Sequence, residues 1–349
     1  MVSPSTPSAL SVVNRQFRLA AVPKGMPKES DFRMTEAPMP SPGEGEVLVR
    51  TAFWSVDPYM RGRITGIRTY ADPVLVGDLM VGRAVGQVVQ SNDEAFRPGD
   101  FVAGSWGWQE WAVGKANGLQ PLDPGMAPVS TALGVLGMPG MTAYFGFLDI
   151  CAPKSGETVV VSGAAGAVGS YVCQIAKIKG CRVIGTAGSD AKVDYLKNDL
   201  GLHGAFNYKT TADDTAKLKE LCPNGIDCYF DNTGGSVSDA VFPLLNTFAR
   251  VSVCGQIAHY NAEKPELGPR LLGQILVKQL RVEGFIVSRF AGRFPEGIAQ
   301  MAQWLKERKL QYREDILDGF EKLPKALIAL LEGANNGKML VRATGMTTT

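Results

Sequence analysis

The feature that most constrains the fold is an apolar run leading directly into a glycine-rich turn and then a helical pattern. Residues 159–161 are three valines, Gly163, Gly166 and Gly169 follow at regular spacing, and apolar residues then recur with helical periodicity. A strand that ends in such a turn aims the free N–H groups and positive dipole end of the next helix at one point. Gly166 would let the backbone approach a diphosphate, and Gly169 would let the helix pack on the strand. We predict a dinucleotide-binding loop, although Ala164 stands where the usual G-x-G-x-x-G motif has a glycine.

The segment around this loop alternates between strand-like and helix-like patterns. Helices are predicted at residues 168–179, 190–199 and 212–221. Buried strands are predicted at residues 158–161, 182–185, 205–207, 227–230, 250–253 and 282–285. Six strands with intervening helices are typical of a parallel, doubly wound α/β sheet.

The two ends of the chain have a different texture. Before about residue 135, short β-branched or aromatic runs such as 47–50, 86–89, 101–103 and 108–113 are broken by Pro, Gly and Asp. Closely spaced short strands predict an antiparallel, barrel-like domain.

The C-terminal part supplies more elements of the same kind. After residue 294 we predict a helix at 298–307, a strand at 310–316, a helix at 324–332 and a strand at 339–341. These last strands would complete the core of the N-terminal part. We therefore expect a discontinuous substrate domain (residues 1–135 and 305–349) with the dinucleotide-binding domain (residues 136–304) inserted in it.

Composition excludes several classes of function. The chain has 36 Lys and Arg against 34 Asp and Glu, interspersed, which argues against a nucleic-acid or membrane-surface partner. No apolar run reaches the roughly 18 residues of a membrane-spanning helix. The six cysteines form no Cys-x-x-Cys pair and only two histidines exist, His203 and His259, so we expect no metal site. Isolated thiols in apolar segments indicate small core residues in a reducing compartment, and we expect a cytoplasmic protein.

The end of the second predicted strand bears on the choice of dinucleotide. NAD sites use an acidic residue there for the ribose hydroxyls, and residues 186–188 offer none. Asp190 is near the expected spacing, but we place it in the first turn of the next helix, with Ser189 as its N-cap. Lys192 in that turn could meet a 2′-phosphate, although a solvated helix lysine is the alternative. The pattern favours NADP.

These residues resemble a known pattern. Residues 164–169 followed by 188–193 are similar to the medium-chain dehydrogenase/reductase superfamily, and the zinc-independent branch of leukotriene/prostaglandin reductases, alkenal double-bond reductases and curcumin reductases fits best. Further landmarks extend the resemblance over nearly the whole chain, at residues 57–63, 107–111, 138–144, 207–210, 230–232, 254–257, 260–261 and 333–338.

The resemblance implies a two-domain subunit with a doubly wound Rossmann sheet inserted in a GroES-like β-barrel domain, NADPH as cofactor, and hydride transfer to the β-carbon of an α,β-unsaturated ketone or aldehyde. It also implies a homodimer, joined near residues 281–285. The cofactor residues that it implies are Met138, Thr142, Gly166, Ala167, Val168, Gly169, Gly188, Ser189, Lys192, Tyr208, Asn232, Cys254, Gly255, Ile257, Tyr260, Phe285, Ile286, Val287 and Asn335.

Reduction of an enone pushes negative charge onto the carbonyl oxygen, so a fixed hydroxyl donor there lowers the barrier. Without a metal or a well-placed histidine acid, a tyrosine or the cofactor ribose must donate the proton. The resemblance places Tyr260 and Tyr59 as catalytic candidates, and ordinary packing is the alternative for both. His259 beside Tyr260 invites a proton relay, but an exposed loop histidine is the blander interpretation.

Other side chains near these motifs have competing interpretations. Arg61 and Arg63 could attract acidic substrates but are more often surface or interdomain partners. Trp106, Trp108 and Trp111 are expected in the core, with an aromatic substrate wall as the alternative.

Three functions remain open from the sequence. The main hypothesis is an NADPH-dependent ene reductase acting on small apolar α,β-unsaturated carbonyl compounds. The second is an NADPH quinone oxidoreductase of the same superfamily, and the third is a non-catalytic NADPH-binding protein that kept the fold.

Overall fold

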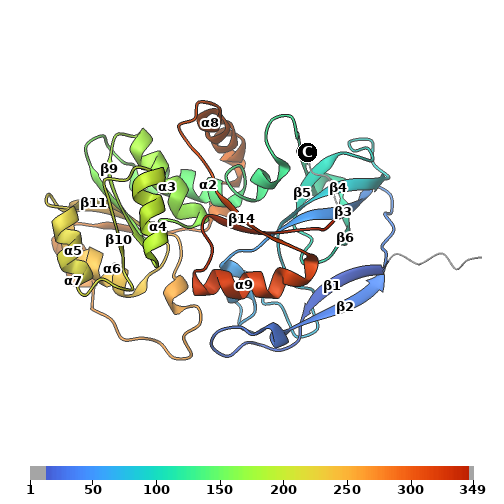
Figure 1. Cartoon of the computed structure of the whole chain (residues 1–349), viewed down its shortest axis with the longest axis horizontal. Coiled ribbons are helices and arrows are strands. Elements are labelled where there is room, and N and C mark those ends of the chain that lie inside the picture. Colours follow the sequence, from blue (N-terminus) through green and yellow to red (C-terminus); the bar gives the residue numbers. More distant parts are fainter. Residues whose placement is uncertain (1–12, 346–349) are drawn as a thin grey trace, which may run out of the picture.

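The computed structural model describes residues 13–345, and two β-sheets occupy opposite ends of an elongated molecule (Figure 1). Helix α8 (Phe294–Lys306), helix α9 (Leu323–Glu332) and strand β14 (Glu314–Asp318) lie between these ends. None of the described helices is long and apolar enough to cross a membrane.

One sheet has six strands, all parallel, in the order β10-β9-β8-β11-β12-β13. In chain order they are β8 (Thr158–Val161), β9 (Arg182–Ala187), β10 (Gly204–Asn207), β11 (Ile226–Asp231), β12 (Leu245–Val253) and β13 (Arg281–Gly284). The order reverses between β8 and β11, which makes their carboxyl ends the switch point where doubly wound sheets bind ligands. The predicted doubly wound sheet is confirmed.

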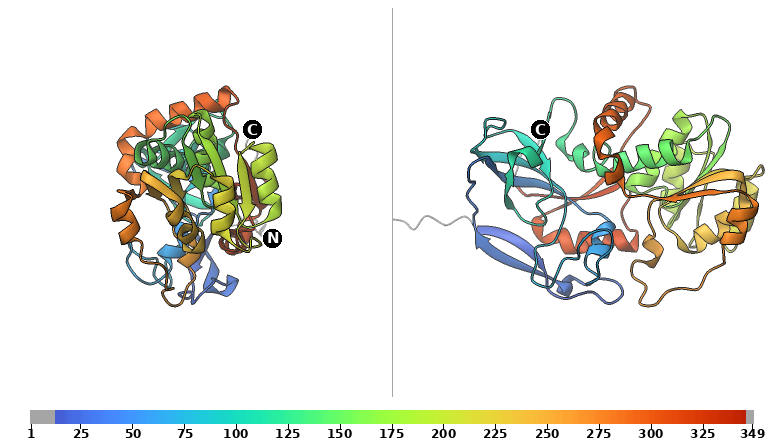
Figure 2. Two further views of the ribbon diagram at one scale, coloured as in Figure 1. Left: turned by 90° about the vertical axis from the view of Figure 1, so that its left-hand side faces the viewer. Right: turned by 180° about the vertical axis from the view of Figure 1, so that it is seen from behind.

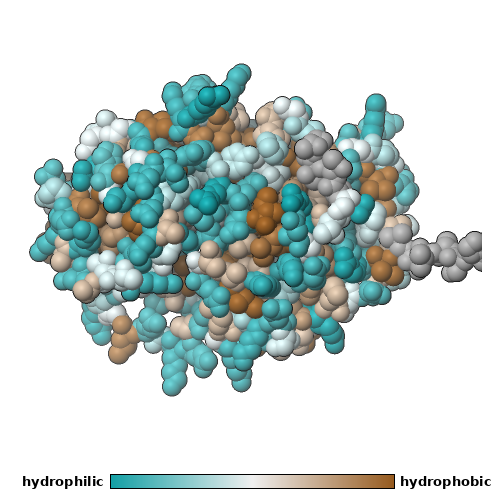
Figure 3. Space-filling view, in the orientation of Figure 1, coloured by the Kyte–Doolittle hydropathy of each residue, from teal (hydrophilic) through white to brown (hydrophobic). Residues whose placement is uncertain are grey.

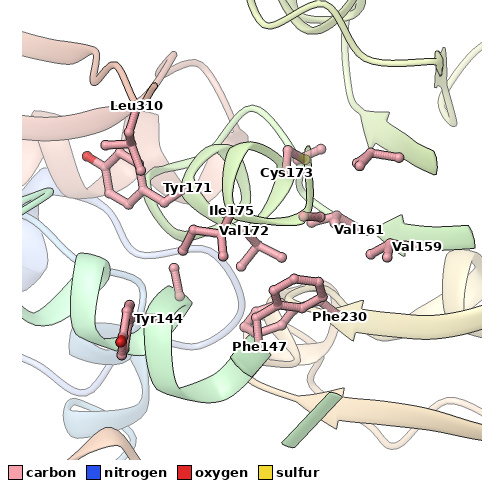
Figure 4. Packing of buried hydrophobic residues seen from close by; sticks show 14 of the residues in the cluster. Tyr144, Phe147, Val159, Val161, Tyr171, Val172, Cys173, Ile175, Phe230 and Leu310 are labelled. Atoms are coloured by element: carbon pink, nitrogen blue, oxygen red, sulfur yellow. The ribbon is translucent and has the colours of Figure 1, made fainter. Parts of the chain in front are cut away.

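Helices cover both faces of this sheet. They are α2 (Met138–Phe145), α3 (Ala167–Ile178), α4 (Asp190–Asp194), α5 (Asp214–Leu221), α6 (Gly235–Val241) and α7 (Leu272–Val277). Val159 and Val161 pack with α2, α3 and α8 on one face, whereas Val160 packs with α5 and α6 on the other. Figure 4 shows Val159, Val161 and Phe230 beneath α3. Burial on both faces explains why β8 reads as an unbroken apolar run.

The second sheet is mixed, in the order β14-β15-β3-β4-β5-β7, and β6 pairs with β3. Its strands are β3 (Glu46–Ser55), β4 (Ala84–Ser91), β5 (Phe101–Gly104), β6 (Trp111–Lys115), β7 (Gln120–Leu122), β14 and β15 (Lys338–Arg342). Strands β1 (Val13–Leu19) and β2 (Phe32–Pro38) form an antiparallel pair beside it. Because β15 pairs with β3, the chain returns to the N-terminal sheet after the six-stranded one, as Figure 2 also shows.

Details of the predicted elements need correction. The strand expected at 310–316 begins only at Glu314, because Leu310 is buried against the six-stranded sheet's core rather than paired in a ladder. The strand expected at 108–113 is β6, starting at Trp111. The helix expected at 190–199 is α4 followed by a wider π-helical turn at Tyr195–Asp199.

The predicted core role is confirmed for five cysteines and for Trp106 and Trp108. Five cysteines are buried, Cys254 is half-buried, and all six are free. Trp106 and Trp108 lie in the core of the seven-stranded sheet, and Trp111 is partly buried. The aromatic-wall alternative is therefore wrong for Trp106 and Trp108.

Candidate active site

The glycine-rich turn lies at the switch point, between β8 and α3. A Cβ at Gly169 would come within 2.3 Å of the carbonyl oxygen of Gly163 and 2.8 Å of the Cα of Ala164, so only glycine lets α3 pack this closely. Gly166 is the N-cap residue of α3, and no side chain of the described residues caps it. The first turn of α3 therefore offers backbone N–H groups to an anion.

The departure at Ala164 has a local structural reason. Ala164 is fully buried, and its N–H donates to the carbonyl of Thr186 at 2.9 Å. Its methyl group lies where a Cβ on Gly185 would approach to 2.8 Å. The usual motif has a glycine at position 164. The methyl group of Ala164 fits here because the neighbouring residue on strand β9 is Gly185, which has no side chain.

The next strand end brings two lysines and a tyrosine around Gly188. A Cβ on Gly188 would lie 3.1 Å from the Tyr208 hydroxyl and 3.2 Å from Cε of Lys209. Lys192 donates from Nζ to the carbonyl of Gly333 at 2.7 Å, and burial followed by the charge of Lys209 lowers its pKa. The neighbouring positive charges of Lys192 and Lys209 suit an anion. Lys209 was not among the residues expected from the sequence, although it lies in the landmark motif at residues 207–210.

The expected positions of Ser189 and Asp190 are confirmed. Ser189 is the N-cap residue of α4, and Asp190 lies in its first turn. The Asp190 carboxylate accepts a hydrogen bond from Nδ2 of Asn207 at 2.8 Å. This carboxylate is engaged in holding β10 to α4.

The ends of β8, β11 and β12 are joined by Asn232 and the residues after β12. The Asn232 side chain donates from Nδ2 to the carbonyl of Ser162 at 2.7 Å. Cys254 and Gly255 donate their N–H groups to the carbonyl of Asp231 at 2.8 and 3.1 Å. A Cβ on Gly255 would lie 3.0 Å from the carbonyl oxygen of Asn232 and 3.6 Å from the Tyr260 hydroxyl. The structure therefore brings Asn232, Cys254, Gly255 and Tyr260 together.

Asp231 organises this junction, and sequence reasoning gave it no role. Its buried carboxylate accepts from both hydroxyl groups and backbone N–H groups of its neighbours. The donors are Ser162 Oγ (3.0 Å), Tyr229 OH (3.0 Å), the N–H groups of Thr233 (3.0 Å) and Gly234 (2.8 Å), Ser238 Oγ (2.7 Å) and Gln256 Nε2 (3.3 Å). So many donors fix the loop after β11 in one conformation.

Asn335 reaches the diphosphate loop from the far end of the sequence. It is buried, and its Nδ2 donates to the carbonyl of Gly337 at 2.8 Å. The N–H of Gly337 in turn donates to the carbonyl of Ala165 at 3.0 Å. The return of the chain through β15 thus places Asn335 beside the loop at Gly166.

Some of the expected cofactor residues are held in contacts away from the glycine-rich turn. Phe285 points into the core, since a Cβ on Gly146 would lie 2.3 Å from its ring, and it meets Phe230 edge-on. Ile286 is 46% exposed. Thr142 is buried, with its hydroxyl donating to the carbonyl of Met138 one turn earlier at 2.7 Å. For Phe285, packing under α2 is the role that its side-chain contacts support.

Three tyrosines, Tyr59, Tyr70 and Tyr260, come near one another, since Tyr70 interacts electrostatically with each of the other two. Tyr59 is the first residue of the short helix α1 (Tyr59–Arg63), and burial raises its pKa well above 10. Burial also raises the pKa of Tyr260, whose hydroxyl accepts the N–H of Gln256 at 3.4 Å. Partial burial raises the pKa of Tyr70, and so does electrostatic interaction with Tyr260. Tyr70 lies in an exposed loop without any sequence motif, which is why sequence reasoning missed it.

The side chains of Lys338 and Asp57 form a buried ion pair close to Tyr59 in the sequence. Lys338 is 1% exposed and contacts Asp57 at 3.0 Å between Nζ and Oδ1. Its ammonium also donates to the carbonyls of Val56 (2.7 Å) and Met339 (2.9 Å). Asp57 in turn accepts a hydrogen bond from Ser55 Oγ. These contacts fix α1 against β15 (Lys338–Arg342), the strand that follows the loop carrying Asn335.

The remaining candidates keep the plainer interpretations. Arg63 donates to the carbonyl of Asp72, and Arg61 is a buried partner of Asn261. His259 lies partly exposed, 3.7 Å from Glu266, and His203 is an exposed loop residue. Across residues 13–345, no group of three or more His, Cys, Asp or Glu side chains is arranged to hold a metal ion.

Comparison with known proteins agrees with this geometry. Residues 15–122 match the family described as "N-terminal domain of oxidoreductase", and residues 167–307 match the family described as "Zinc-binding dehydrogenase". The chain belongs to the medium-chain dehydrogenase/reductase superfamily, in the zinc-independent branch that includes curcumin, prostaglandin and 2-alkenal reductases. The resemblance noted from the sequence is confirmed.

Individual relatives match over almost the full length. The NADPH-dependent curcumin reductase of Escherichia coli (strain K12) is 46% identical over 338 residues, which are 95% of this chain and 97% of that protein. Prostaglandin reductase 1 of Mus musculus is 46% identical over 324 residues, covering 92% and 96%. The crystal structure of CurA in complex with NADPH from Vibrio vulnificus has a TM-score of 0.92 at 45% identity, covering 95% of this chain and all of that one.

Proposed function

We propose that this chain reduces the carbon–carbon double bond of α,β-unsaturated ketones and aldehydes with NADPH. The observation that carries the proposal is the meeting of the diphosphate-type turn at Gly166 with the Gly255–Tyr260 segment at one switch point. Relatives at 46% identity that are named for NADPH and for curcumin or prostaglandin reduction support it, as does a tobacco relative named as an NADP-dependent 2-alkenal reductase.

The residues present fit NADPH. Gly169 lets α3 pack closely on the turn, Gly166 leaves the start of α3 without a side chain, and Lys192 with Lys209 provides positive charge near Gly188. NADPH, when bound, supplies the hydride. The residues proposed to hold it are Met138, Thr142, Gly166, Ala167, Val168, Gly169, Gly188, Ser189, Lys192, Tyr208, Asn232, Cys254, Gly255, Ile257, Tyr260, Ile286, Val287 and Asn335, with Phe285 as support from the core.

Tyr260 and Tyr59 are proposed as the hydroxyl donors for the substrate. Because burial raises both pKa values, both phenols are protonated at neutral pH. A neutral O–H can donate to the carbonyl oxygen as negative charge develops there, and donors of this kind are the main electrostatic aid to such a step. Tyr70, which interacts with Tyr260, is proposed as a wall of the substrate site.

The test is a comparison of substrates at fixed cofactor. The purified chain is mixed with NADPH, and the loss of reduced-nicotinamide absorbance is followed with an alkenal, an aryl enone and a quinone. Turnover of the enal and enone with saturated carbonyl products supports the proposal. Turnover of the quinone alone would favour an NADPH quinone oxidoreductase, and tight NADPH binding without turnover would favour a non-catalytic binding protein.

We further propose a homodimer joined through the outer edge of β13. This strand ends the six-stranded sheet, and Val282 is 37% exposed on it. On the neighbouring α7, Leu272 and Leu276 are 80% and 77% exposed. An open edge strand with apolar neighbours is a pairing surface, whereas on the face in Figure 3 apolar side chains form small separate patches. Light scattering on a sizing column should give twice the chain mass, and Val282→Lys should halve it.

The domain limits and the cellular location are also proposals. We place the substrate domain at 1–135 and 305–349 and the dinucleotide-binding domain at 136–304, supported by the pairing of β15 with β3. We assign the chain to the cytoplasm, supported by six free thiols. Limited proteolysis and cell fractionation would check these two assignments.

A further inference from the structure

Arg61 is a buried guanidinium whose surroundings are unusual for an arginine. It is 5% exposed, and burial lowers its pKa while only the charge of Asp31 opposes that shift. Nη1 of Arg61 is buried without a hydrogen-bond partner among the described residues. Burial of a charge without a close counter-ion is costly. A side chain kept there at such a cost is expected to do more than fill space.

The contacts of Arg61 join three segments that are far apart in the sequence. Nε donates to Oδ1 of Asn261 at 2.9 Å. Nη2 donates to the carbonyl of Gly25 at 3.0 Å and approaches that of Pro23 at 3.5 Å. The fork therefore clamps the β1–β2 connection and the loop after β12 onto helix α1.

Two further contacts hold the same junction together. Nδ2 of Asn261 donates to Sδ of Met26 at 3.4 Å. Gly25 has φ +66°, and a Cβ there would lie 3.2 Å from Oε1 of Glu263 and 3.9 Å from the carbonyl oxygen of Asn261. The backbone of the β1–β2 connection thus runs directly against residues 261–263.

The junction lies next to two of the tyrosines in the sequence. Asn261 follows Tyr260, and Arg61 lies two residues after Tyr59. The Tyr260 hydroxyl accepts one long hydrogen bond, from the N–H of Gln256 at 3.4 Å, and the backbone N–H of Tyr260 donates to the carbonyl of Ile257 at 3.3 Å. The position of Tyr260 relative to helix α1 therefore depends on the contact between its neighbour Asn261 and Arg61.

We propose that Arg61 and Asn261 form a positioning bridge that holds the loop carrying Tyr260 against the helix carrying Tyr59. This role rests on the proposed reductase function, and neither residue is a catalytic residue. Misplacement of a reacting or donating group by about 1 Å can cost about a hundredfold in rate. The bridge acts on the substrate step and leaves the diphosphate loop at Gly166 undisturbed.

The test uses full-length variants that remove or retain the bridge. Arg61→Met and Asn261→Leu each remove the bridge. The double variant removes both partners and tests whether the two losses are additive. Asn261→Asp retains an acceptor for Nε and adds a charge-assisted bond. Arg15→Met is the matched control, because Arg15 on β1 pairs with Glu110 at 2.6 Å and lies outside this junction. Steady-state rates with trans-2-nonenal, NADPH affinity by fluorescence, melting temperature and hydrogen exchange of residues 256–263 are measured for each.

The bridge predicts a particular pattern of results. Each removing variant should lower kcat by at least about tenfold with NADPH Kd within about twofold of wild type. The double variant should be no worse than the worse single one, because both remove the same interaction. Asn261→Asp should retain most of the rate, and hydrogen exchange of residues 256–263 should accelerate only in the removing variants.

Other patterns would overturn the bridge. An unchanged kcat in Arg61→Met or Asn261→Leu, additive losses in the double variant, or an Asn261→Asp rate as low as that of Asn261→Leu would each do so. If Arg61→Met does not fold, the comparison of Asn261→Leu with Asn261→Asp still tests the bridge. Asn261 is a half-buried loop residue, so its substitution is compatible with folding. If the wild-type chain is inactive with every enal and enone, the proposed function is wrong. In that case the bridge is tested separately by hydrogen exchange of residues 256–263, and unaltered exchange in Arg61→Met and Asn261→Leu would contradict it.

Discussion

The diphosphate end of the candidate site and its tyrosine end are built from different parts of the chain. At the diphosphate end, one continuous stretch from β8 through Gly166 into α3 supplies the backbone N–H groups. At the tyrosine end, Tyr59, Tyr70 and Tyr260 come from three separate segments, and side-chain contacts such as Arg61 to Asn261 set their positions. The first end depends on local backbone geometry, whereas the second depends on how distant loops meet.

This difference separates binding from chemistry. A change at the diphosphate end should weaken NADPH, because the loop contacts only the cofactor in our proposal. A change at the tyrosine end should slow turnover much more than it weakens NADPH binding. Variants at the two ends should therefore move different measured quantities.

The largest expected effect is at Tyr260. Tyr260→Phe removes the phenol O–H but keeps the ring, and loss of one donor to a developing oxyanion costs about 2.7–4 kcal/mol, or roughly 10²–10³ in kcat. Single-turnover rates with an enone and NADPH titrations should show this loss in rate with a much smaller loss of NADPH affinity. Tyr312→Phe, a half-buried tyrosine outside the crevice, is the control. An unchanged rate would remove Tyr260 from the chemistry and shift attention to Tyr59→Phe.

The next effect is at Gly169. Gly169→Ala places a Cβ 2.3 Å from the carbonyl oxygen of Gly163, so α3 must move away from the loop. Overpacking of this kind costs about 1–3 kcal/mol of stability, and the displaced N–H groups should weaken NADPH binding by about tenfold or more. Melting curves and fluorescence titrations check both effects.

A glycine elsewhere supplies the comparison for Gly169. A Cβ on Gly118 would meet nothing within 4 Å, and its backbone is not in the left-handed region. Gly118→Ala should leave both stability and NADPH affinity close to wild type. Equal losses in the two variants would show that the close packing at Gly169 is not what holds the loop in shape.

A smaller and more selective effect is expected at Lys192. Lys192→Ala should weaken NADPH by about tenfold, the value of a hydrogen bond to a charged group, and NADH by less than about twofold. The selectivity follows because the lysine is proposed to meet only the 2′-phosphate. Lys197→Ala, an exposed lysine just after α4, is the control. Equal losses for both cofactors would contradict the assignment, and a small loss with NADPH would point to Lys209 as the main partner.

The sequence predicted the local geometry at Gly169 and Ser189 well for a physical reason. Close approach at Gly169 and an N-cap at Ser189 are local requirements, so residue type and spacing identify them without knowledge of distant contacts. The inner strands such as β8 were predicted for the same reason, since burial on both faces leaves an apolar run, whereas β13 is mostly exposed and the expected burial of that strand was wrong. The limits of β14 were wrong because Leu310 is buried by tertiary packing rather than by strand pairing.

The tyrosine end was less predictable because its contacts are long-range. Tyr260 and Tyr59 were found only through a family resemblance, and Tyr70 was not found. Nothing near Arg61 in the sequence indicates that its partner lies 200 residues away. The packing role of Phe285 likewise depends on Gly146, whose missing side chain makes room for the ring.

The smallest expected effect is a flat pH profile, which sharpens the role of the phenols. Donation needs the neutral O–H, and burial raises the pKa of Tyr260 and Tyr59 above the ordinary value of 10. The raised pKa extends the neutral form upwards in pH, so kcat measured with an enone should not fall between pH 7 and about 9.5. A chelator should leave the rate unchanged over the same range. A decline with a midpoint near pH 8 would mean that a group other than these buried phenols donates the proton, and the tyrosine end would then only shape the substrate site.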